Sequence, residues 1–243
     1  MKKIILILFI IPLTIFGQKY QEPDFINLLN DEYNESEVLN IPEFSVIGWS
    51  KGGLFAYRII YSYDGIGLDS DLIVVYNLKN DKVVDLIYLY GGENDYNFDY
   101  EDILNFNYNI FWRYNQRRID KFLSDYNIIQ NFSNKFYINE YIDKYEIILK
   151  NRTSMCEEPD NGWEYGKEYE HEYRLLVGNS NTGYKKVANG LLDCGYSSMN
   201  FVGYFKSPIE NRMVVILSSH MSFKGDEDWR LHFFGCSLDP STF

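Results

Sequence analysis

The stretch Phe44–Ile60, FSVIGWSKGGLFAYRII, supports two interpretations, and the choice between them decides the predicted fold. Its segment Gly48–Gly52 fits the pattern G-x-S-x-G, which presents a catalytic serine at a turn between a strand and a helix. Leu54–Tyr61, which follows the turn, is instead rich in the aromatic and β-branched residues of a strand. The stretch is therefore predicted to be the start of a β-hairpin.

The alternative is a secreted serine hydrolase that uses Ser50. In an α/β-hydrolase several strands precede the nucleophile, and an acidic residue and then a histidine follow it. The residues before Phe44 are polar and mixed, without a strand pattern, and so short a motif also arises by chance in glycine-containing turns. We therefore interpret Ser50 as a turn residue and Trp49 as a packing residue.

Two more strand-like segments follow, Asp71–Leu78 and Val83–Tyr90, with a turn-forming sequence between them. Residues 44–90 resemble a blade of the TolB-type β-propeller, in the segments Trp49-Ser50, Ala56-Tyr57 and Tyr76–Lys82. Asn77 and Asp81 replace the aspartate and glycine that are usual in that turn. The resemblance implies a β-repeat architecture and no particular activity.

A helical pattern interrupts the strands between about residues 99 and 130. Asp99 is a suitable N-cap. Apolar residues then recur at helical spacing, namely Tyr108, Phe111, Trp112, Ile119, Phe122, Leu123 and Tyr126. Arg113, Arg117 and Lys121 lie four residues apart and are expected to share a solvated face of this amphipathic helix.

Strand patterns return after residue 134 and contain a weak internal repeat. Val46–Lys51 parallels Phe201–Lys206, and in both places a polar turn leads to an apolar strand, an acidic loop and a second strand. Residues 136–190 follow the same order. We predict a mainly β fold of three long antiparallel hairpin units with an α-helical insert near 100–130. The units form either a propeller-like array or a two-sheet sandwich.

The N-terminus has the composition of a secretory signal peptide. Met1-Lys2-Lys3 is basic, and residues 4–16 are apolar but fewer than the roughly 20 residues that span a bilayer. Cleavage after Gly17 would leave residues 18–243 as a single β-rich domain with its insert at about 99–130. This predicts a secreted or periplasmic protein with no transmembrane segment after cleavage; a retained signal anchor is the alternative.

Composition and charge limit the function classes. Hydrophobic residues make up 46% of the chain and aromatic residues 18%, which indicates a folded protein with a sizeable core. The formal net charge of −12 opposes binding to the phosphate backbone of nucleic acid. We therefore expect no nucleic-acid partner.

If the three hairpins align, their long loops, predicted at residues 62–70, 151–167 and 219–228, lie at one end of the fold. These loops bring acidic and aromatic residues together, namely Tyr63, Asp64, Asp69, Glu157, Glu158, Asp160, Trp163, Asp226, Glu227, Asp228 and Trp229. Such a surface suits calcium, a basic patch on another protein, or a glycan stacked on tryptophan. Solvated loops without a ligand are the alternative.

The cysteines and histidines indicate no metal or catalytic site. The hairpin alignment places Cys194 and Cys236 at the end opposite Cys156, so we predict a disulfide between Cys194 and Cys236. Strand alternation separates His171 from the neighbouring glutamates. Ser218, His220 and Asp226 are close in sequence, whereas a catalytic triad joins groups from separate elements. The sequence therefore predicts an exported, non-catalytic binding or envelope-associated module.

Overall fold

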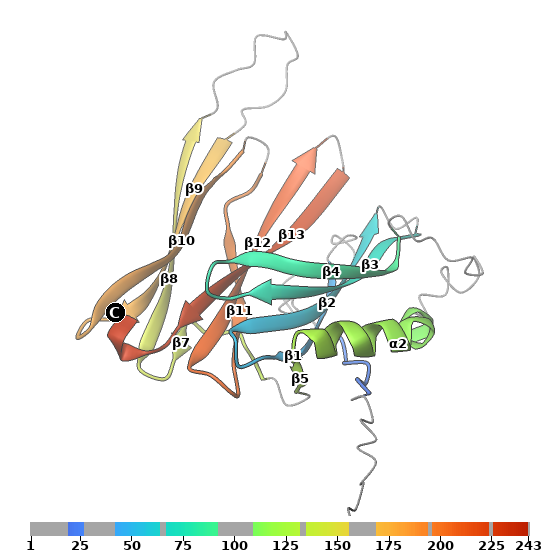
Figure 1. Cartoon of the computed structure of the whole chain (residues 1–243). Coiled ribbons are helices and arrows are strands. Elements are labelled where there is room, and N and C mark those ends of the chain that lie inside the picture. The colour runs from blue at the N-terminus through green and yellow to red at the C-terminus, as the bar shows by residue number, and fades with distance from the viewer. Residues whose placement is uncertain are drawn as a thin grey trace, which may run out of the picture.

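The computed structural model describes residues 19–26, 42–63, 67–91, 109–131, 135–155, 169–193, 196–223 and 226–242. These residues form three antiparallel β-sheets and one α-helix, stacked as layers (Figure 1). The predicted mainly β fold with a helical insert is confirmed. The sheets face one another as in a sandwich, with three sheets in place of two.

The N-terminal sheet has the strand order β4-β3-β2-β1-β5. Its strands are β1 (Glu43–Trp49), β2 (Leu54–Tyr63), β3 (Gly67–Asn77), β4 (Lys82–Tyr90) and β5 (Ile129–Gln130). The stretch that contains Ser50 therefore forms β1, a turn and β2, as the hairpin interpretation predicts. A cluster of aromatic side chains, including the stacked rings of Tyr57 and Phe233, lies between this sheet and the next.

The central sheet has the order β13-β12-β11-β6, and the outer sheet has the order β10-β9-β8-β7. The central strands are β6 (Phe136–Tyr137), β11 (Asn200–Lys206), β12 (Arg212–Phe223) and β13 (Asp226–Ser237). The outer strands are β7 (Tyr141–Ile142), β8 (Tyr145–Met155), β9 (Tyr169–Asn179) and β10 (Gly183–Leu192). A short 3₁₀ helix, Pro240–Thr242, follows β13.

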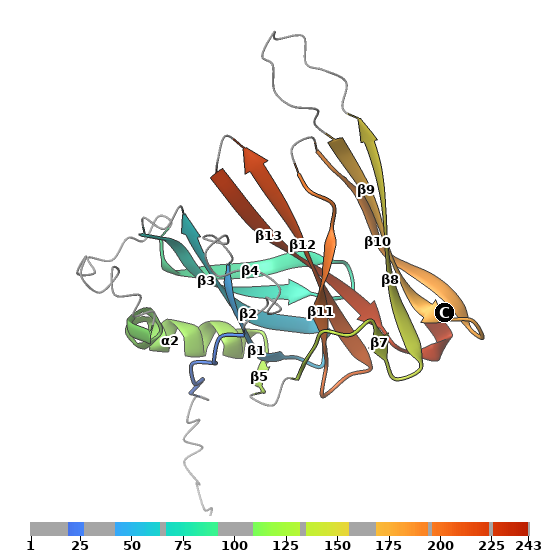
Figure 2. The ribbon, with the colours of Figure 1, turned by 180° about the vertical axis from the view of Figure 1, so that it is seen from behind.

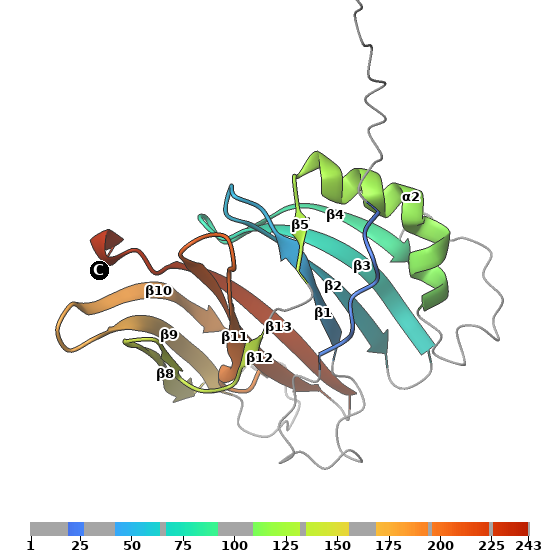
Figure 3. The same cartoon turned by 90° about the horizontal axis from the view of Figure 1, so that it is seen from below.

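Helix α2 (Asn109–Asp125) covers the face of the N-terminal sheet that points away from the central sheet (Figure 3). It ends in a Schellman motif, because Asn127 has a left-handed φ of 52° and the amide of Ile128 donates to the carbonyl of Leu123 at 3.0 Å. The order of layers is therefore α2, N-terminal sheet, central sheet and outer sheet. No helix in the described ranges is long and apolar enough to cross a membrane.

Strand β12 shows why this stack forms. The run Met213–Ser219 is buried along its whole length, because the N-terminal sheet packs on one of its faces and the outer sheet on the other. A strand that is buried on both faces needs a continuous apolar run in place of alternation. Each large apolar side chain removed from water contributes about 1.5–3 kcal/mol, so burial of both faces of β12 stabilises the stack.

The internal repeat is present in the structure. Strand β1 has a bulge between Val46 and Gly48 where it pairs with β2, and β11 has one between Phe201 and Gly203 where it pairs with β12. A Cβ on Gly48 would overlap the Ile129 carbonyl, and short strand β5 pairs there. Gly203 likewise leaves room for β6 beside β11. Both glycines admit a short strand at the outer edge of a repeated hairpin.

The turn between β3 and β4 joins the N-terminal sheet to the edge of β13. Asp81, at a left-handed φ of 52°, accepts a hydrogen bond from the Gly235 amide at 2.6 Å. The hydroxyl of Tyr76 donates to the Phe233 carbonyl at 2.7 Å. These two bonds satisfy backbone groups that an edge strand would otherwise leave open.

Candidate functional site

The outward face of the outer sheet is the main candidate site, because no described helix or strand packs on it (Figure 2). The inward face of this sheet packs on the central sheet through side chains such as Ile147, Leu175 and Val177. Alternation places the intervening residues on the outward face. Among them, the side chains of Lys150, Arg152 and Leu191 are exposed.

Strand register aligns the outward side chains in rows across β8, β9 and β10. Arg152 lies opposite Glu172, which in turn lies opposite Leu191. The next row contains Lys150, Arg174 and Asn189. Each row therefore contains one residue from each of the three strands, and the side chains form a polar surface with one exposed leucine.

A groove of about 510 Å³ crosses this surface. Its lining consists of Arg152, Ser154, Glu172, Asn189, Gly190 and Leu191. The volume lies within the range of small-ligand sites, about 300–1,000 Å³. The groove contains a guanidinium, a carboxylate, a hydroxyl and an amide, which are the groups that orient a polar ligand.

The sequence-predicted loop site is only partly described. Asp64, Glu157, Glu158, Asp160 and Trp163 lie outside the described residues. Tyr63, Asp69, Asp226, Glu227 and Asp228 lie in β2, β3 and β13, and only their backbone is described. Trp229 packs on His220 with ring centroids 4.9 Å apart. Whether these residues gather around a ligand stays a prediction.

The predicted loop boundaries were wrong, because strand pairing continues further along each hairpin. Strand β3 begins at Gly67, β8 extends to Met155, and β12 extends to Phe223. The ladder between β12 and β13 runs without interruption to the pair Phe223 and Asp226. Polar composition indicated loops there, but backbone pairing tolerates polar residues wherever a strand end faces solvent.

The described residues contain no group of three or more histidine, cysteine, aspartate or glutamate side chains that could hold a metal ion. The Cys236 thiol is buried and donates to the Ser237 carbonyl at 3.4 Å, and burial raises its pKa to about 11. Cys194 and Cys156 lie outside the described part of the chain. The Cys194–Cys236 disulfide and a calcium site in the loops therefore stay predictions.

Ser50 lies in the turn between β1 and β2, with a strand and not a helix after it. Its side-chain oxygen accepts a hydrogen bond from the Gly52 amide at 3.2 Å, and its own amide donates to the Leu54 carbonyl at 3.0 Å. The residue is only 4% exposed. These bonds are those of a hairpin turn, and they differ from the strand-to-helix geometry of a nucleophile elbow.

A serine–histidine contact occurs elsewhere, and the sequence analysis missed it. The hydroxyl of Ser219 and Nε2 of His232 are 2.8 Å apart, on the face of the central sheet that points to the outer sheet. Burial, helped by Arg230, lowers the pKa of His232, which favours the neutral imidazole. Ser219 is fully buried, so its hydroxyl is out of reach of a substrate. The register of β12 and β13 is the signal that would have revealed the pair.

His171 lies where strand alternation predicted. Its Nδ1 is 3.2 Å from the hydroxyl of Thr153, its register partner on β8. The neighbouring Tyr173 packs into the core between the central and outer sheets, whereas Glu172 lines the groove on the opposite face. The separation of His171 from Glu172 is therefore confirmed.

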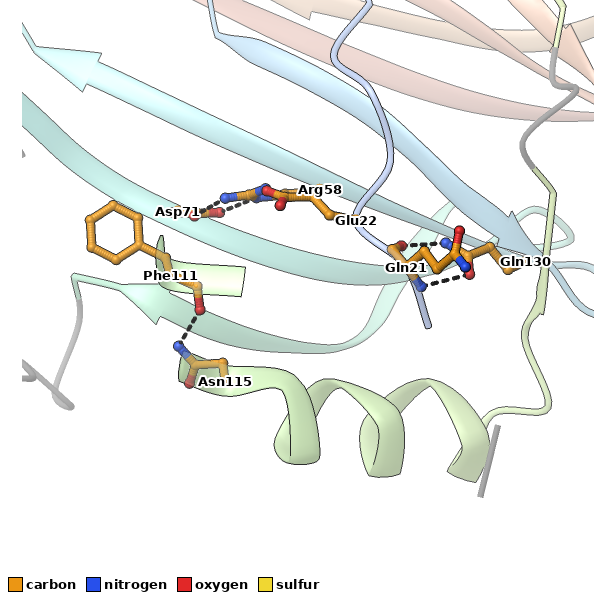
Figure 4. Close-up of polar contacts among 7 residues, drawn as sticks. All are labelled: Gln21, Glu22, Arg58, Asp71, Phe111, Asn115 and Gln130. Carbon is orange, nitrogen blue, oxygen red and sulfur yellow. Dashed lines mark hydrogen bonds and ion pairs between the residues drawn. The ribbon is translucent and has the colours of Figure 1, made fainter. Parts of the chain in front are cut away.

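The structure also contains a buried charged cluster that the sequence analysis missed (Figure 4). Arg58 donates to Asp71 through Nε at 2.8 Å and through Nη2 at 2.6 Å, and its Nη1 donates to Glu22. The rings of Phe25 and Trp112 lie 5.1 and 5.7 Å from the guanidinium carbon. A charge within the apolar run of β2 was the signal for this cluster.

The cluster holds the segment 19–26 against the N-terminal sheet. The Tyr20 hydroxyl donates to the Ile128 carbonyl at 2.6 Å, and Gln21 and Gln130 exchange two hydrogen bonds (Figure 4). Arg58 and Asp71 are both fully buried beneath this segment. Each nitrogen of the guanidinium already has a carboxylate partner, so we assign the cluster a structural role.

No protein-family model matches the chain, and neither the curated proteins nor the solved structures include a match to it. The resemblance of residues 44–90 to a propeller blade therefore stays a prediction.

Proposed function

We propose that this chain is an exported, non-catalytic binding module whose ligand lies on the outward face of the outer sheet. The observation that carries the proposal is the groove of about 510 Å³ on a sheet face that no described element covers. Its polar groups come from strands, so their positions are set by the ladder of β8, β9 and β10. A site on paired strands is more rigid than one on loops.

Binding fits the described residues better than hydrolysis does. A hydrolase needs a nucleophile that a substrate can reach and a base within hydrogen-bond distance of it. Ser219 has a histidine partner but is fully buried, and Ser50 bonds to its own turn. Arg152 and Asn189, by contrast, are exposed in the groove. Export is supported by the apolar segment 4–16, which lies outside the described residues.

The proposal is tested by comparing three forms of the mature chain, residues 18–243, on arrays of glycans and peptides. The forms are wild type, Arg152→Ala and Arg117→Ala, where Arg117 is an exposed arginine on α2 and serves as the matched control. We expect ligands that wild type and Arg117→Ala bind and that Arg152→Ala loses. Equal binding by all three forms would place the site elsewhere.

A fluorophosphonate probe, which labels reactive serines, distinguishes the serine hydrolase alternative from the binding proposal. We expect no labelling that depends on Ser50, because its hydroxyl is buried in a hairpin turn. Labelling of wild type that disappears in Ser50→Ala, with the fold intact by circular dichroism, would replace the binding proposal with a hydrolase.

The calcium version of the loop site has its own test. A thermal-shift titration to millimolar calcium should raise the melting temperature if the acidic loops bind the ion, because a ligand of the native state stabilises it. An unchanged melting temperature removes calcium as a ligand.

A further inference from the structure

We infer that the groove binds a carbohydrate that carries carboxylate groups, and that the guanidinium of Arg152 holds one of these carboxylates. The inference rests on the proposed function, because it names the ligand class of the same groove. It follows from three properties of the outward face, which are an arginine without an ion pair among the described residues, a local excess of positive charge, and a lining suited to sugar hydroxyls.

The first property is the open guanidinium of Arg152. Glu172 lies directly opposite Arg152 on β9, which is the position of a cross-strand ion pair. The carboxylate of Glu172 instead lies 3.9 Å from Nη2 of Arg174. Among the described residues Arg152 has no ion-pair partner. Its planar group is free to donate two parallel hydrogen bonds to a carboxylate of a ligand.

The second property is the charge of the face. The chain as a whole carries a formal net charge of −12. On the outward face of β8–β10, however, the strand registers place four cations, Lys150, Arg152, Arg174 and Lys186, beside three carboxylates, Glu146, Glu170 and Glu172. Glu146 already accepts a hydrogen bond from Tyr184 at 2.8 Å. These side chains give the face a net charge of +1, so an anion meets less repulsion here than over the chain as a whole.

The third property is the lining beside Arg152. Ser154 and Asn189 each contain a group that donates and accepts hydrogen bonds, as sugar hydroxyls require. Leu191 is 57% exposed and offers an apolar contact to the C–H face of a sugar ring. The groove thus combines an anion site with neutral polar groups and one apolar surface.

The pairing of β9, the middle strand of the groove, argues against an extended peptide. Peptides that join a sheet pair with the open backbone groups of an edge strand. The groove lining comes from β8, β9 and β10 together, and the backbone of β9 is paired on both sides. The backbone of β10, at the edge of the sheet, is open to such a peptide, but a ligand that lies over β9 meets side chains only, which suits a carbohydrate.

The experiment measures binding of the mature chain to oligogalacturonate by calorimetry, with the methyl-esterified oligomer and a neutral galactose oligomer as comparisons. We expect the ester and the neutral oligomer to bind about ten-fold more weakly, since each loses the charge-assisted bond. Arg152→Ala should weaken oligogalacturonate binding by about ten-fold as well, and Arg152→Lys by less. Arg117→Ala should leave it unchanged.

Glu172→Gln provides a test with the opposite sign. The Glu172 carboxylate repels a carboxylated ligand, so its removal should strengthen oligogalacturonate binding several-fold and leave the neutral oligomer unaffected. Weakening in Arg152→Ala together with strengthening in Glu172→Gln is expected only for an anionic ligand.

The outcomes separate this inference from the proposed function. The neutral and charged oligomers could bind with equal affinity, and Arg152→Ala could abolish both. That result would support a binding module at this groove, but it would contradict the inference that the ligand carries a carboxylate. If an acidic peptide binds more tightly than oligogalacturonate, the inference that the ligand is a carbohydrate is wrong. No uronate binding, with array ligands that still depend on Arg152, also overturns the inference alone. If no ligand's binding depends on Arg152, both this inference and the proposed function are wrong.

Discussion

Arg58 and Arg152 lie in the N-terminal and outer sheets, on opposite sides of the central sheet, and have opposite environments. Arg58 is fully buried on β2, and its guanidinium donates to Asp71 and Glu22. Arg152 is exposed on β8, and no carboxylate in the described ranges forms an ion pair with it. A satisfied, buried arginine stabilises the fold, whereas an exposed arginine without an ion pair is available to a ligand. The comparison predicts that stability depends on Arg58 and binding on Arg152.

The largest effect is expected from breaking the buried pair. Asp71→Asn leaves the Arg58 charge without its bidentate partner, and we expect a loss of about 3–5 kcal/mol in the free energy of unfolding. Urea denaturation followed by tryptophan fluorescence measures it. The double variant Arg58→Met, Asp71→Leu, which removes both charges, should recover much of that loss. A loss below about 1 kcal/mol in Asp71→Asn would contradict the structural role.

A buried neutral group in the same layer should have a smaller effect. Asn115 on α2 donates to the Phe111 carbonyl at 2.9 Å (Figure 4). It also donates to the Leu89 carbonyl at 3.1 Å, and so ties the helix to β4. Asn115→Ala is expected to cost about 1–3 kcal/mol, because it leaves the buried Leu89 carbonyl without this partner. Arg113→Ala, two residues before Asn115 on the same helix and exposed, is the control in the same denaturation experiment.

His232 should make the stability of the fold depend on pH. Its pKa is lowered in the folded state, so between that value and the ordinary value of about 6.5 the unfolded chain binds more protons. Stability should therefore fall as pH decreases below about 6.5, with a slope of at most about 1.4 kcal/mol per pH unit from this residue. His232→Gln should reduce this slope relative to wild type. Equal slopes in the two proteins would exclude His232 as the cause.

Glu22 tests whether partial exposure reduces the contribution of a charge. Its side chain is 19% exposed, and it shares Arg58 with the fully buried Asp71. We expect Glu22→Gln to cost about 1 kcal/mol, because solvent screens the lost charge and Asp71 still pairs with Arg58. Thermal unfolding of Glu22→Gln and Asp71→Asn, measured in parallel, ranks the two losses of stability. A cost as large as that of Asp71→Asn would mean that segment 19–26 is essential to the pair.

The smallest effect on stability is expected from the outer sheet. Arg152→Ala removes an exposed side chain with no ion pair in the described part of the chain, so the free energy of unfolding should change by less than about 0.5 kcal/mol. Its effect should appear in ligand binding only. A large loss of stability would assign Arg152 to the fold and weaken the binding proposal.

The sequence predicted the parts of the fold that depend on local pattern. Aromatic and β-branched runs located β1 to β4, and helical spacing located α2. The structure confirms these strands and this helix. They could be predicted because their periodicity is a property of neighbouring residues. The repeat of Val46–Lys51 in Phe201–Lys206 was also visible, and its glycines lie at the two bulges. Loop boundaries were wrong because backbone pairing at hairpin ends does not require apolar residues.

The candidate site could not be predicted in this way. The polar rows of β8–β10 have the composition of any solvated strand face, and only the stacking of three sheets shows that no described element covers this face. The pairing of Arg58 with Asp71, and of Ser219 with His232, depends on strand register. Register and stacking are long-range properties, set by which apolar faces bury each other.

The sequence by itself determined the β class, the helical insert, the hairpin at Ser50 and the acidic charge, because each depends only on composition or on short-range periodicity. Only the tertiary structure decided which partners surround each arginine, Asp71 and Glu22 for Arg58 and the open groove for Arg152. The physical reason is that burial depends on the layer packed above a strand, and residues distant in sequence supply that layer.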